Sequence, residues 1–347
     1  MKICIDLCVD SDGAMFKELA EKLIERDHEV LITARDKVQA LDLYRYEGLD
    51  FHIVGKYAKT LEEKLLASAE RIYKMTKLIK QELKGLDAII SNTGVEASRV
   101  GFGLGAQVHT FHDHPEAIHQ FLLTIPISTY VYYPWVINKS FYKRHGIKNE
   151  ALVPYNGFLS ASWMPKIKVD ENIIQKLGLD KDRKVIVFRE SEMGAAYLFG
   201  RNAITLPAIK KLAETRKNVQ FVARPRYHSS ILEGYFKGLK NITIFKNPID
   251  LQSLLAKADL LIGGGATMCL EATYFGTPTI MSRQITSPIT DYLEDVGLAV
   301  TAKSVVDIIK LSRNHMNKRN EKLAREIYDQ MEFPLDTVIN NIEAIKK

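Results

Sequence analysis

Short strand-like runs alternate with segments of helical periodicity along the whole chain. The runs occupy 2–9, 29–34, 50–54, 87–91, 107–111 and 129–133 in the first half, and 184–190, 218–223, 242–245, 260–262 and 279–281 in the second. Between them, apolar residues recur at helical spacing, as in 14–26, where Phe16, Leu19 and Leu23 share one face. Apolar runs this short are typical of strands buried in a parallel sheet. Strands that alternate with helices predict doubly wound, Rossmann-like α/β domains.

One segment, 258–281, joins such a strand to a helix through three consecutive glycines. The glycines occupy 263–265, and a helical pattern then continues until Gly276 and Pro278. We expect the glycines to let the backbone turn sharply and to leave the main-chain N–H groups uncovered. Because unpaired N–H groups and the positive end of the helix dipole meet there, the pattern predicts an anion site, with phosphate as the commonest ligand.

Two side chains on the predicted helix suit a nucleotide. Thr267 can add a hydroxyl at the phosphate, and Glu271, one turn further on, can accept hydrogen bonds from a sugar diol. The alternative is that the glycines only form a tight turn and that Glu271 is an exposed helix residue. The spacing alone leaves both interpretations open.

The full string is more specific than its glycines. Gly-Gly-Gly-Ala-Thr at 263–267, Glu-Ala at 271–272 and Gly-Thr-Pro at 276–278 together resemble the nucleotide-sugar segment of glycosyltransferase-B-type (GT-B) proteins. Similar strings occur in the peptidoglycan N-acetylglucosaminyltransferase and in UDP-N-acetylglucosamine 2-epimerase. The resemblance implies that Gly264, Gly265, Ala266 and Thr267 bind phosphate and that Glu271 binds ribose hydroxyls. It also indicates an uncharacterised prokaryotic family of unknown function on this fold.

The resemblance implies two Rossmann-like domains facing a cleft, and 347 residues suffice to give each a sizeable core. Proline and glycine punctuate the irregular stretch 150–170, so we place the domain boundary at about 160. The first domain, 1–160, would lie on the acceptor side, and the second, 161–333, would bind the nucleotide sugar. The last helix, 334–347, is expected to pack back on the first domain, as the C-terminal helix does in this fold.

Three arginines follow predicted strands of the second domain. Arg189, Arg224 and Arg226 each lie at or just beyond a strand's carboxyl end, on the side of the sheet where the glycine segment also lies. A guanidinium group binds phosphate through two parallel hydrogen bonds and stays charged at any relevant pH. We therefore expect these arginines to bind the diphosphate, with solvated surface arginine as the alternative.

The predicted strand ends of the first domain carry acids and histidines. The loop 10–13 contains a single glycine, where many relatives of the GT-B type have two or more. The loop 112–119 contains three histidines and two carboxylates, and its spacing matches no established metal motif. A metal site or a helix cap are alternatives there, but a general base would be expected at such a strand end. Within this loop we favour Asp113 and His114, without a choice between them.

Composition excludes several classes of protein. No apolar run approaches the 18 residues that a membrane-spanning helix needs, and a predicted strand directly follows Met1-Lys2, so we expect a cytoplasmic protein. Cys4, Cys8 and Cys269 have no metal-ligand spacing. The net charge of +6 is spread along the chain and suits anionic substrates or an anionic membrane surface, while no motif for nucleic acid is present.

These features together favour a metal-independent glycosyltransferase whose donor is a nucleotide-diphosphate sugar, with UDP as the expected carrier and no further cofactor. The acceptor is unknown and can be a sugar, a lipid-linked compound or another small molecule. Asp113 or His114 would accept the proton of its hydroxyl. A 2-epimerase that uses Asp10, Asp12, Asp113 and Glu116 is the second hypothesis. A nucleotide-binding protein without catalysis is the third, because the first loop offers only Gly13.

Overall fold

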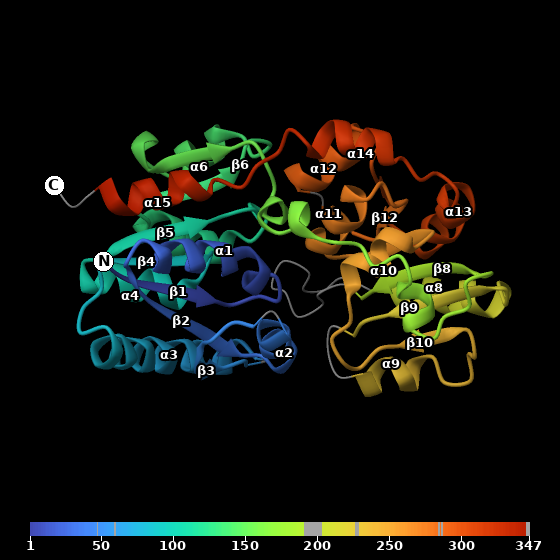
Figure 1. Ribbon diagram of the computed structural model, residues 1–347, viewed down its shortest axis with the longest axis horizontal. Helices are drawn as coiled ribbons and strands as arrows, with labels where there is room; N and C mark the ends of the chain where they lie inside the picture. The colour runs from blue at the N-terminus through green and yellow to red at the C-terminus, as the bar shows by residue number, and fades with distance from the viewer. Residues whose placement is uncertain are drawn as a thin grey trace. The chain divides into compact units, whose positions relative to one another are not determined.

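The computed structural model describes residues 1–46, 48–58, 60–190, 203–225, 229–283, 285 and 287–344. The chain divides into two compact units, each with its own parallel sheet (Figure 1). Unit 1 comprises Met1–Trp163 together with Glu332–Lys347, and unit 2 comprises Met164–Met331. The C-terminal segment therefore belongs to the same unit as the N-terminus.

The sheet of unit 1 has the strand order β3-β2-β1-β4-β5-β6-β7. Its strands are β1 (Lys2–Leu7), β2 (Glu29–Asp36), β3 (His52–Lys56), β4 (Ala88–Asn92), β5 (Gln107–Phe111), β6 (Tyr130–Pro134) and β7 (Leu152–Tyr155). Neighbouring strands are parallel, and Ile5 of β1 lies opposite Ile32 on one side and Ile90 on the other. Residues 3–7 of β1 are buried, which explains their nearly continuous apolar run.

Helices cover both faces of this sheet. They are α1 (Asp12–Glu25), α2 (Val38–Tyr46), α3 (Leu61–Glu82), α4 (Val95–Leu104), α5 (Ile118–Thr124), α6 (Lys139–Arg144) and α15 (Leu335–Glu343). The crossover through α1 runs from β1 to β2, whereas that through α4 runs the opposite way across the sheet, from β4 to β5. Because both crossovers are right-handed by rule, α1 and α4 lie on opposite faces. On α1 the predicted face, Phe16, Leu19 and Leu23, is buried.

Helix α15 packs on the first part of the chain. It contacts α1, and its Glu343 carboxylate forms ion pairs with Arg26 (3.2 Å) and His28 (3.0 Å). The Gln107 side-chain amide donates a hydrogen bond to the Ile342 carbonyl (3.1 Å), and the Asn341 amide donates one to the Tyr132 hydroxyl (3.2 Å). These contacts fix the end of the chain on unit 1.

The sheet of unit 2 has the order β10-β9-β8-β11-β12-β13, and its strands are also parallel. The strands are β8 (Lys184–Arg189), β9 (Val219–Ala223), β10 (Ile242–Ile244), β11 (Leu260–Gly263), β12 (Thr279–Met281) and β13 (Val300–Thr301). The helices are α7 (Ile173–Lys176), α8 (Thr205–Thr215), α9 (Ser229–Tyr235), α10 (Leu251–Lys257), α11 (Ala266–Tyr274), α12 (Pro288–Asp295), α13 (Val305–His315) and α14 (Glu321–Tyr328). A core that includes Ile186, Phe188, Phe221 and Ile262 joins sheet and helices.

The doubly wound α/β architecture predicted from the alternation is confirmed in both units. The sequence of 303–331 predicts a long, charged helix that is broken near 316–320, and in the structure α13 ends at His315 while α14 begins at Glu321. No helix within the described ranges combines the length and the apolar content that crossing a bilayer requires.

Candidate functional site

In unit 2 the chain reverses its direction across the sheet between β8 and β11. Strands β9 and β10 follow on one side of β8, and β11, β12 and β13 follow on the other. In sheets of this type ligands bind outside the carboxyl ends of the strands at this switch point. Arg189, the last residue of β8, lies opposite Gly263, the last residue of β11. The glycine segment and one predicted arginine therefore meet at the switch point of unit 2.

The helix that follows the glycines begins without a side-chain cap. The N-cap residue of α11 is Gly265, which has no side chain that could accept a hydrogen bond from the first turn. Gly264, Gly265 and Thr267 are half-buried, and Ala266 is buried. The first-turn N–H groups of an α-helix have no partner inside the helix, so they can hydrogen-bond an anion at this end.

Of the three glycines, Gly264 lies at a bend of the chain, as expected from the sequence, whereas the backbone at Gly263 and Gly265 does not require glycine. Gly265 is extended, with φ −95° and ψ 130°, and Gly263 has no positive φ. A Cβ atom added to Gly263 would meet its nearest neighbours at 3.8–4.0 Å, which is ordinary contact. At Gly263 and Gly265 the backbone therefore adopts conformations that other residues also adopt. What glycine contributes at the half-buried positions is the missing side chain, which leaves space beside the helix N-terminus.

Glu271 is buried, which excludes the exposed helix residue considered as an alternative. Its side chain projects from the second turn of α11, and only 6% of the residue is exposed. The Gln252 side-chain amide, on α10, donates a hydrogen bond of 3.0 Å to Glu271 Oε1. An amide donor orients a carboxylate without neutralising it. Gln252 was not predicted, because no sequence pattern relates two residues on separate helices.

The structure places two of the three predicted arginines at neighbouring strand ends. Arg189 ends β8, and Arg224 directly follows β9, which pairs with β8 through Phe188 and Ala223. Both arginines are half-buried. Arg226 lies outside the described residues. Arg189, Arg224 and the start of α11 therefore occupy the carboxyl ends of three adjacent strands.

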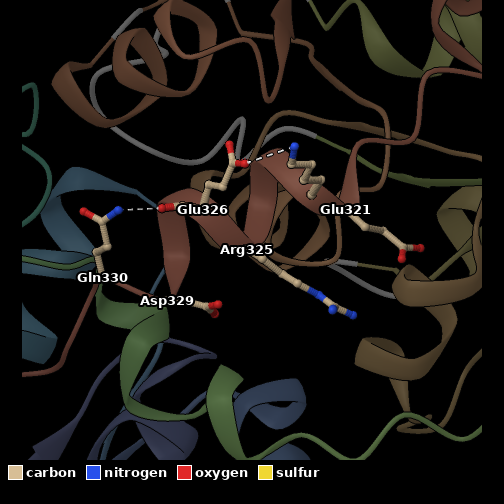
Figure 2. Close-up of a pocket in the computed structure, with 6 residues that line it drawn as sticks. Glu321, Arg325, Glu326, Asp329 and Gln330 are labelled. Atoms are coloured by element: carbon tan, nitrogen blue, oxygen red, sulfur yellow. Dashed lines mark hydrogen bonds and ion pairs between the residues drawn. The ribbon is translucent and has the colours of Figure 1, made fainter.

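A surface depression of unit 2 lies elsewhere, on the outer face of α14 (Figure 2). Its lining is entirely charged or polar and consists of Glu321, Lys322, Arg325, Glu326, Asp329 and Gln330. Lys322 and Glu326 form an ion pair of 3.8 Å, and both side chains are mostly exposed. A solvated pair at helical spacing is typical of a helix surface. We therefore do not assign the nucleotide to this depression.

Unit 1 has its own switch point, between β1 and β4. Here Asp12, at the start of α1, is buried and accepts hydrogen bonds from the main-chain N–H groups of Cys8 (2.7 Å) and Val9 (2.9 Å). The Asn92 side-chain amide, at the end of β4, donates to its other oxygen (3.2 Å). Burial raises the pKa of the Asp12 carboxyl to about 7, although the three donors oppose the shift. Asp12 thus closes the first loop onto β4.

The next residue after Asn92 has a strained backbone. Thr93 has a φ of 52°, a left-handed value that is unusual for a β-branched residue. Its hydroxyl donates a hydrogen bond to the Phe111 carbonyl at the end of β5 (2.8 Å). Backbone strain of this kind costs on the order of 1–3 kcal/mol and occurs preferentially at functional sites.

The carboxyl end of β5 holds the predicted base. His114 lies between two carboxylates, with Nε2 3.7 Å from Asp113 Oδ1 and Nδ1 3.7 Å from Glu116 Oε1. The side chains of Asp113 and Glu116 are 9% exposed, whereas that of His114 is 38% exposed. The structure therefore brings Asp113, His114 and Glu116 together, with the imidazole as the most accessible of the three. Imidazole and carboxylate side chains are the groups that most often act as general bases.

The other histidines of this loop do not join the group. His112 is buried, its Nδ1 lies 2.8 Å from the Tyr142 hydroxyl, and burial lowers its pKa to about 3. His119 is exposed on α5. Nowhere in the part of the chain that the structure describes do three or more His, Cys, Asp or Glu side chains form a group suited to a metal ion. The metal alternative for this loop therefore has no geometric support among these residues.

A buried ionic network beneath the switch point of unit 1 was not predicted. Arg71, on α3, binds both carboxylate oxygens of Asp6 at 2.6 and 2.9 Å and donates to the Val54 carbonyl. Glu96 lies between Arg71 (3.5 Å) and Arg35 (2.8 Å). The sequence of 61–84 predicts a long basic helix, and a single buried arginine on such a helix leaves no periodic signal.

Comparison with known proteins shows the fold. An uncharacterized protein of Methanocaldococcus jannaschii aligns with this chain at 27% identity over an alignment length of 354. The alignment covers 98% of this chain and 100% of that protein. The solved UDP-GlcNAc 2-epimerase of Neisseria meningitidis, bound to UDP-GlcNAc, superposes with a TM-score of 0.75 and 14% identity, covering 98% of this chain and 99% of that one. The spinosyn forosaminyltransferase SpnP gives 0.63 and 13%, covering 100% of both chains.

These structural likenesses confirm the predicted GT-B fold. At sequence identities of 13–14% they show the fold and do not show the function. Enzymes of two kinds, an epimerase and a glycosyltransferase, share it. The predicted resemblance to an uncharacterised family on this fold is confirmed as well. The family model matches residues 1–343, and the chain belongs to the family described as "Protein of unknown function (DUF354)".

Proposed function

We propose that this protein acts on a nucleotide-diphosphate sugar and transfers the sugar to an acceptor. The observation that carries the proposal is the uncapped start of α11 at the switch point of unit 2, with buried Glu271 one turn into the same helix. The N–H groups of Ala266 and Thr267 would bind the diphosphate, and Glu271 would accept hydrogen bonds from the ribose diol. UDP is the carrier that we favour, because the epimerase of the same fold was solved with UDP-GlcNAc.

The proposed reaction needs no metal ion. Arg189, at the end of β8 beside β11, and Arg224, at the end of β9 on the far side of β8, would supply positive charge to the diphosphate, and Arg226 follows them in the sequence. Together with the helix N-terminus they would stabilise the negative charge that develops on the leaving diphosphate. The protein should therefore bind and turn over its donor in the presence of a chelator.

Unit 1 would supply the base. In the transfer, the acceptor hydroxyl oxygen forms a bond to the anomeric carbon, the bond from that carbon to the diphosphate oxygen breaks, and the hydroxyl proton moves to the protein. We assign the proton to His114, the accessible member of its group. Asp113 and Glu116 would stabilise the imidazolium that forms.

Epimerisation at sugar C2 is the second candidate, and one arrangement favours it. Asp113 and Glu116 lie on opposite sides of His114, so one group could remove a proton from a carbon atom and another return it. The epimerase of Neisseria meningitidis also superposes more closely than the transferase, with TM-scores of 0.75 and 0.63. The two reactions differ in one respect that can be measured, because only epimerisation exchanges the C2 proton without an acceptor.

The test is an incubation of the protein with UDP-GlcNAc in D₂O and a chelator, followed by proton NMR. A transferase leaves the C2 proton in place and releases UDP, slowly with water and faster with a true acceptor. An epimerase incorporates deuterium at C2. His114→Asn should abolish either reaction, whereas Glu326→Ala, on the exposed face of α14, should not. If UDP-GlcNAc and other UDP sugars undergo neither change, the proposed function is wrong.

A further inference from the structure

Tyr155 has a buried hydroxyl group that no described residue satisfies. It is the last residue of β7, opposite Pro134 of β6, and is 6% exposed. Its Oη atom has no hydrogen-bond partner among the described residues. Other buried tyrosines of unit 1 are paired: the Tyr142 hydroxyl with His112 Nδ1 (2.8 Å) and the Tyr132 hydroxyl with His109 Nδ1 (3.0 Å). An unsatisfied buried hydroxyl destabilises the fold, so its retention requires a reason.

The Tyr155 ring is held in place by the returning C-terminal segment. Phe333 meets the ring edge-on with 6.3 Å between centroids, and the same Phe333 stacks on Phe111 at 5.1 Å. Just beyond Tyr155, the Glu332 N–H donates a hydrogen bond to the Asn156 carbonyl (2.9 Å). A Cβ atom on Gly157 would lie 2.4 Å from the Glu332 carbonyl oxygen, so the two segments fit only with glycine there. The ring is therefore fixed before any ligand binds.

Contacts of Phe333 and the charge of Asp113 relate Tyr155 to the Asp113–His114 group, which holds the proposed base. Phe111, which Phe333 covers, is the last residue of β5, and Asp113 and His114 follow it directly. Burial raises the pKa of Tyr155 well above its usual value, and the nearby Asp113 carboxylate raises it further. The phenol therefore stays protonated at neutral pH and can donate a hydrogen bond. A group that is buried, fixed and protonated is suited to binding an oxygen atom without reacting itself.

We propose that Tyr155 is a substrate-binding residue of unit 1 and that its hydroxyl hydrogen-bonds a carbohydrate hydroxyl at the Asp113–His114 group. The identity of the ligand rests on the proposed function, whereas the unsatisfied hydroxyl and its fixed ring do not. In the complex the ligand oxygen replaces the missing partner. The bond would align the sugar or acceptor hydroxyl for proton transfer to His114.

Two matched variants test this role. Tyr155→Phe removes a hydroxyl that has no partner in the free protein, so its melting temperature without ligand should equal or exceed that of the wild type. Tyr142→Phe removes a hydroxyl paired with His112 and should lower the melting temperature. Turnover of UDP-GlcNAc by Tyr155→Phe, measured as kcat/KM, should fall by about 10- to 100-fold, as expected when one hydrogen bond to the reacting group is lost. UDP affinity, a property of unit 2, should not change.

The outcomes separate this inference from the proposed function. If Tyr155→Phe lowers the melting temperature as Tyr142→Phe does and leaves kcat/KM unchanged, the hydroxyl is structural and the inference is wrong. If the wild type turns over no UDP sugar, the proposed function fails instead, and N-acetylglucosamine becomes the probe. A thermal shift by this sugar that Tyr155→Phe abolishes would support the binding role. An equal shift, or none in the wild type, would overturn it.

Discussion

Asp6 and Asp12 show how strongly neighbours determine the chemistry of a buried carboxylate. Both side chains are fully buried in unit 1. Burial alone would raise the pKa of Asp6, but the Arg71 guanidinium, bound to both its oxygens, holds the pKa below its usual value. Asp12 has only neutral donors, and burial raises its pKa to about 7. Two neutral main-chain donors and an amide therefore do not offset desolvation, whereas one guanidinium does.

The raised pKa of Asp12 predicts a pH dependence of stability. Because the folded protein binds this proton more tightly than the unfolded chain does, its contribution is complete below about pH 4 and is lost as the pH rises through 7. Asp12→Asn is neutral throughout this range. The free energy of unfolding of the variant, relative to the wild type, should therefore increase between pH 4 and pH 7 in urea titrations.

Asp42→Asn is the matched control for this measurement, because Asp42 is an exposed acid of the same unit. Its effect on the free energy of unfolding should stay within about 0.5 kcal/mol over the same pH range. A difference between Asp12→Asn and the wild type that does not vary with pH would contradict the assignment.

At the level of residues, the sequence predicted groups that belong to a contiguous motif and missed their partners. Glu271 follows the glycines within the same sequence motif, so the motif predicted both the residue and its role as a ligand of the ribose hydroxyls. Gln252 lies outside that motif and reaches Glu271 from another helix. The contact that holds the Tyr155 ring was likewise not foreseen, because it comes from a segment more than 170 residues later. Contacts between distant segments leave no pattern in a single sequence.

Among the elements, α3 departs most from its expected role. Its sequence indicated a long basic helix, yet Arg71 is one of the largest fully buried side chains of the protein. Gly55 of β3, with a φ of 76°, gives Arg71 room, because a Cβ atom there would lie 2.8 Å from Arg71 Cγ. The helix therefore contributes a charge to the interior of unit 1, beneath the loops that leave β1 and β4.

Arg71→Met should destabilise the protein by about 3–5 kcal/mol at neutral pH, because it leaves the buried Asp6 carboxylate without its cation. In the wild type the pKa of Asp6 is lowered, so the pair stabilises the fold above about pH 4 and loses this effect as the pH falls further. The deficit of the variant should therefore shrink in acid. Chemical denaturation at pH 7 and pH 3 measures both quantities.

Arg99→Met, on the exposed side of α4, removes the same charge from the same unit and should change the free energy of unfolding by no more than about 0.5 kcal/mol. An equal loss in both variants would mean that the network is not what stabilises unit 1. A deficit of Arg71→Met that persists unchanged at pH 3 would likewise contradict the pairing with Asp6.

The alternating order of the long strands and helices was predictable from the sequence, whereas the shortest elements and the backbone conformation of the turns were not. Alternating apolar runs predicted both sheets, because the central strands, such as β1, β4, β9 and β11, are buried on both faces and the crossover helices carry apolar stripes. The two-residue strand β13 and the four-residue helix α7 were missed, since elements this short have no measurable period. The sequence did not show which of the three glycines forms the turn: the chain bends at Gly264, whereas Gly265 is extended, and φ values cannot be inferred from composition.

For the molecule as a whole, the two units carry different chemistry. Unit 2 offers N–H groups, two described arginines and a buried glutamate at one switch point, which suits a nucleotide diphosphate. Unit 1 offers carboxylates, an imidazole and a fixed phenol at its strand ends, which suits proton transfer on a carbohydrate. This division of roles, on a fold that an epimerase and a glycosyltransferase share, is the basis of the proposed function.

Titration calorimetry with UDP in the presence of EDTA tests this account most directly. The account predicts saturable binding to the wild type. Glu271→Ala should weaken it at least 10-fold, because charge-assisted hydrogen bonds to the ribose are worth about 1.5–3 kcal/mol. Glu326→Ala, in the depression on α14, should bind UDP like the wild type. If UDP, ADP, GDP, CDP and TDP all fail to bind the wild type, or if Glu326→Ala weakens binding and Glu271→Ala does not, the assignment of the nucleotide to the glycine segment is wrong.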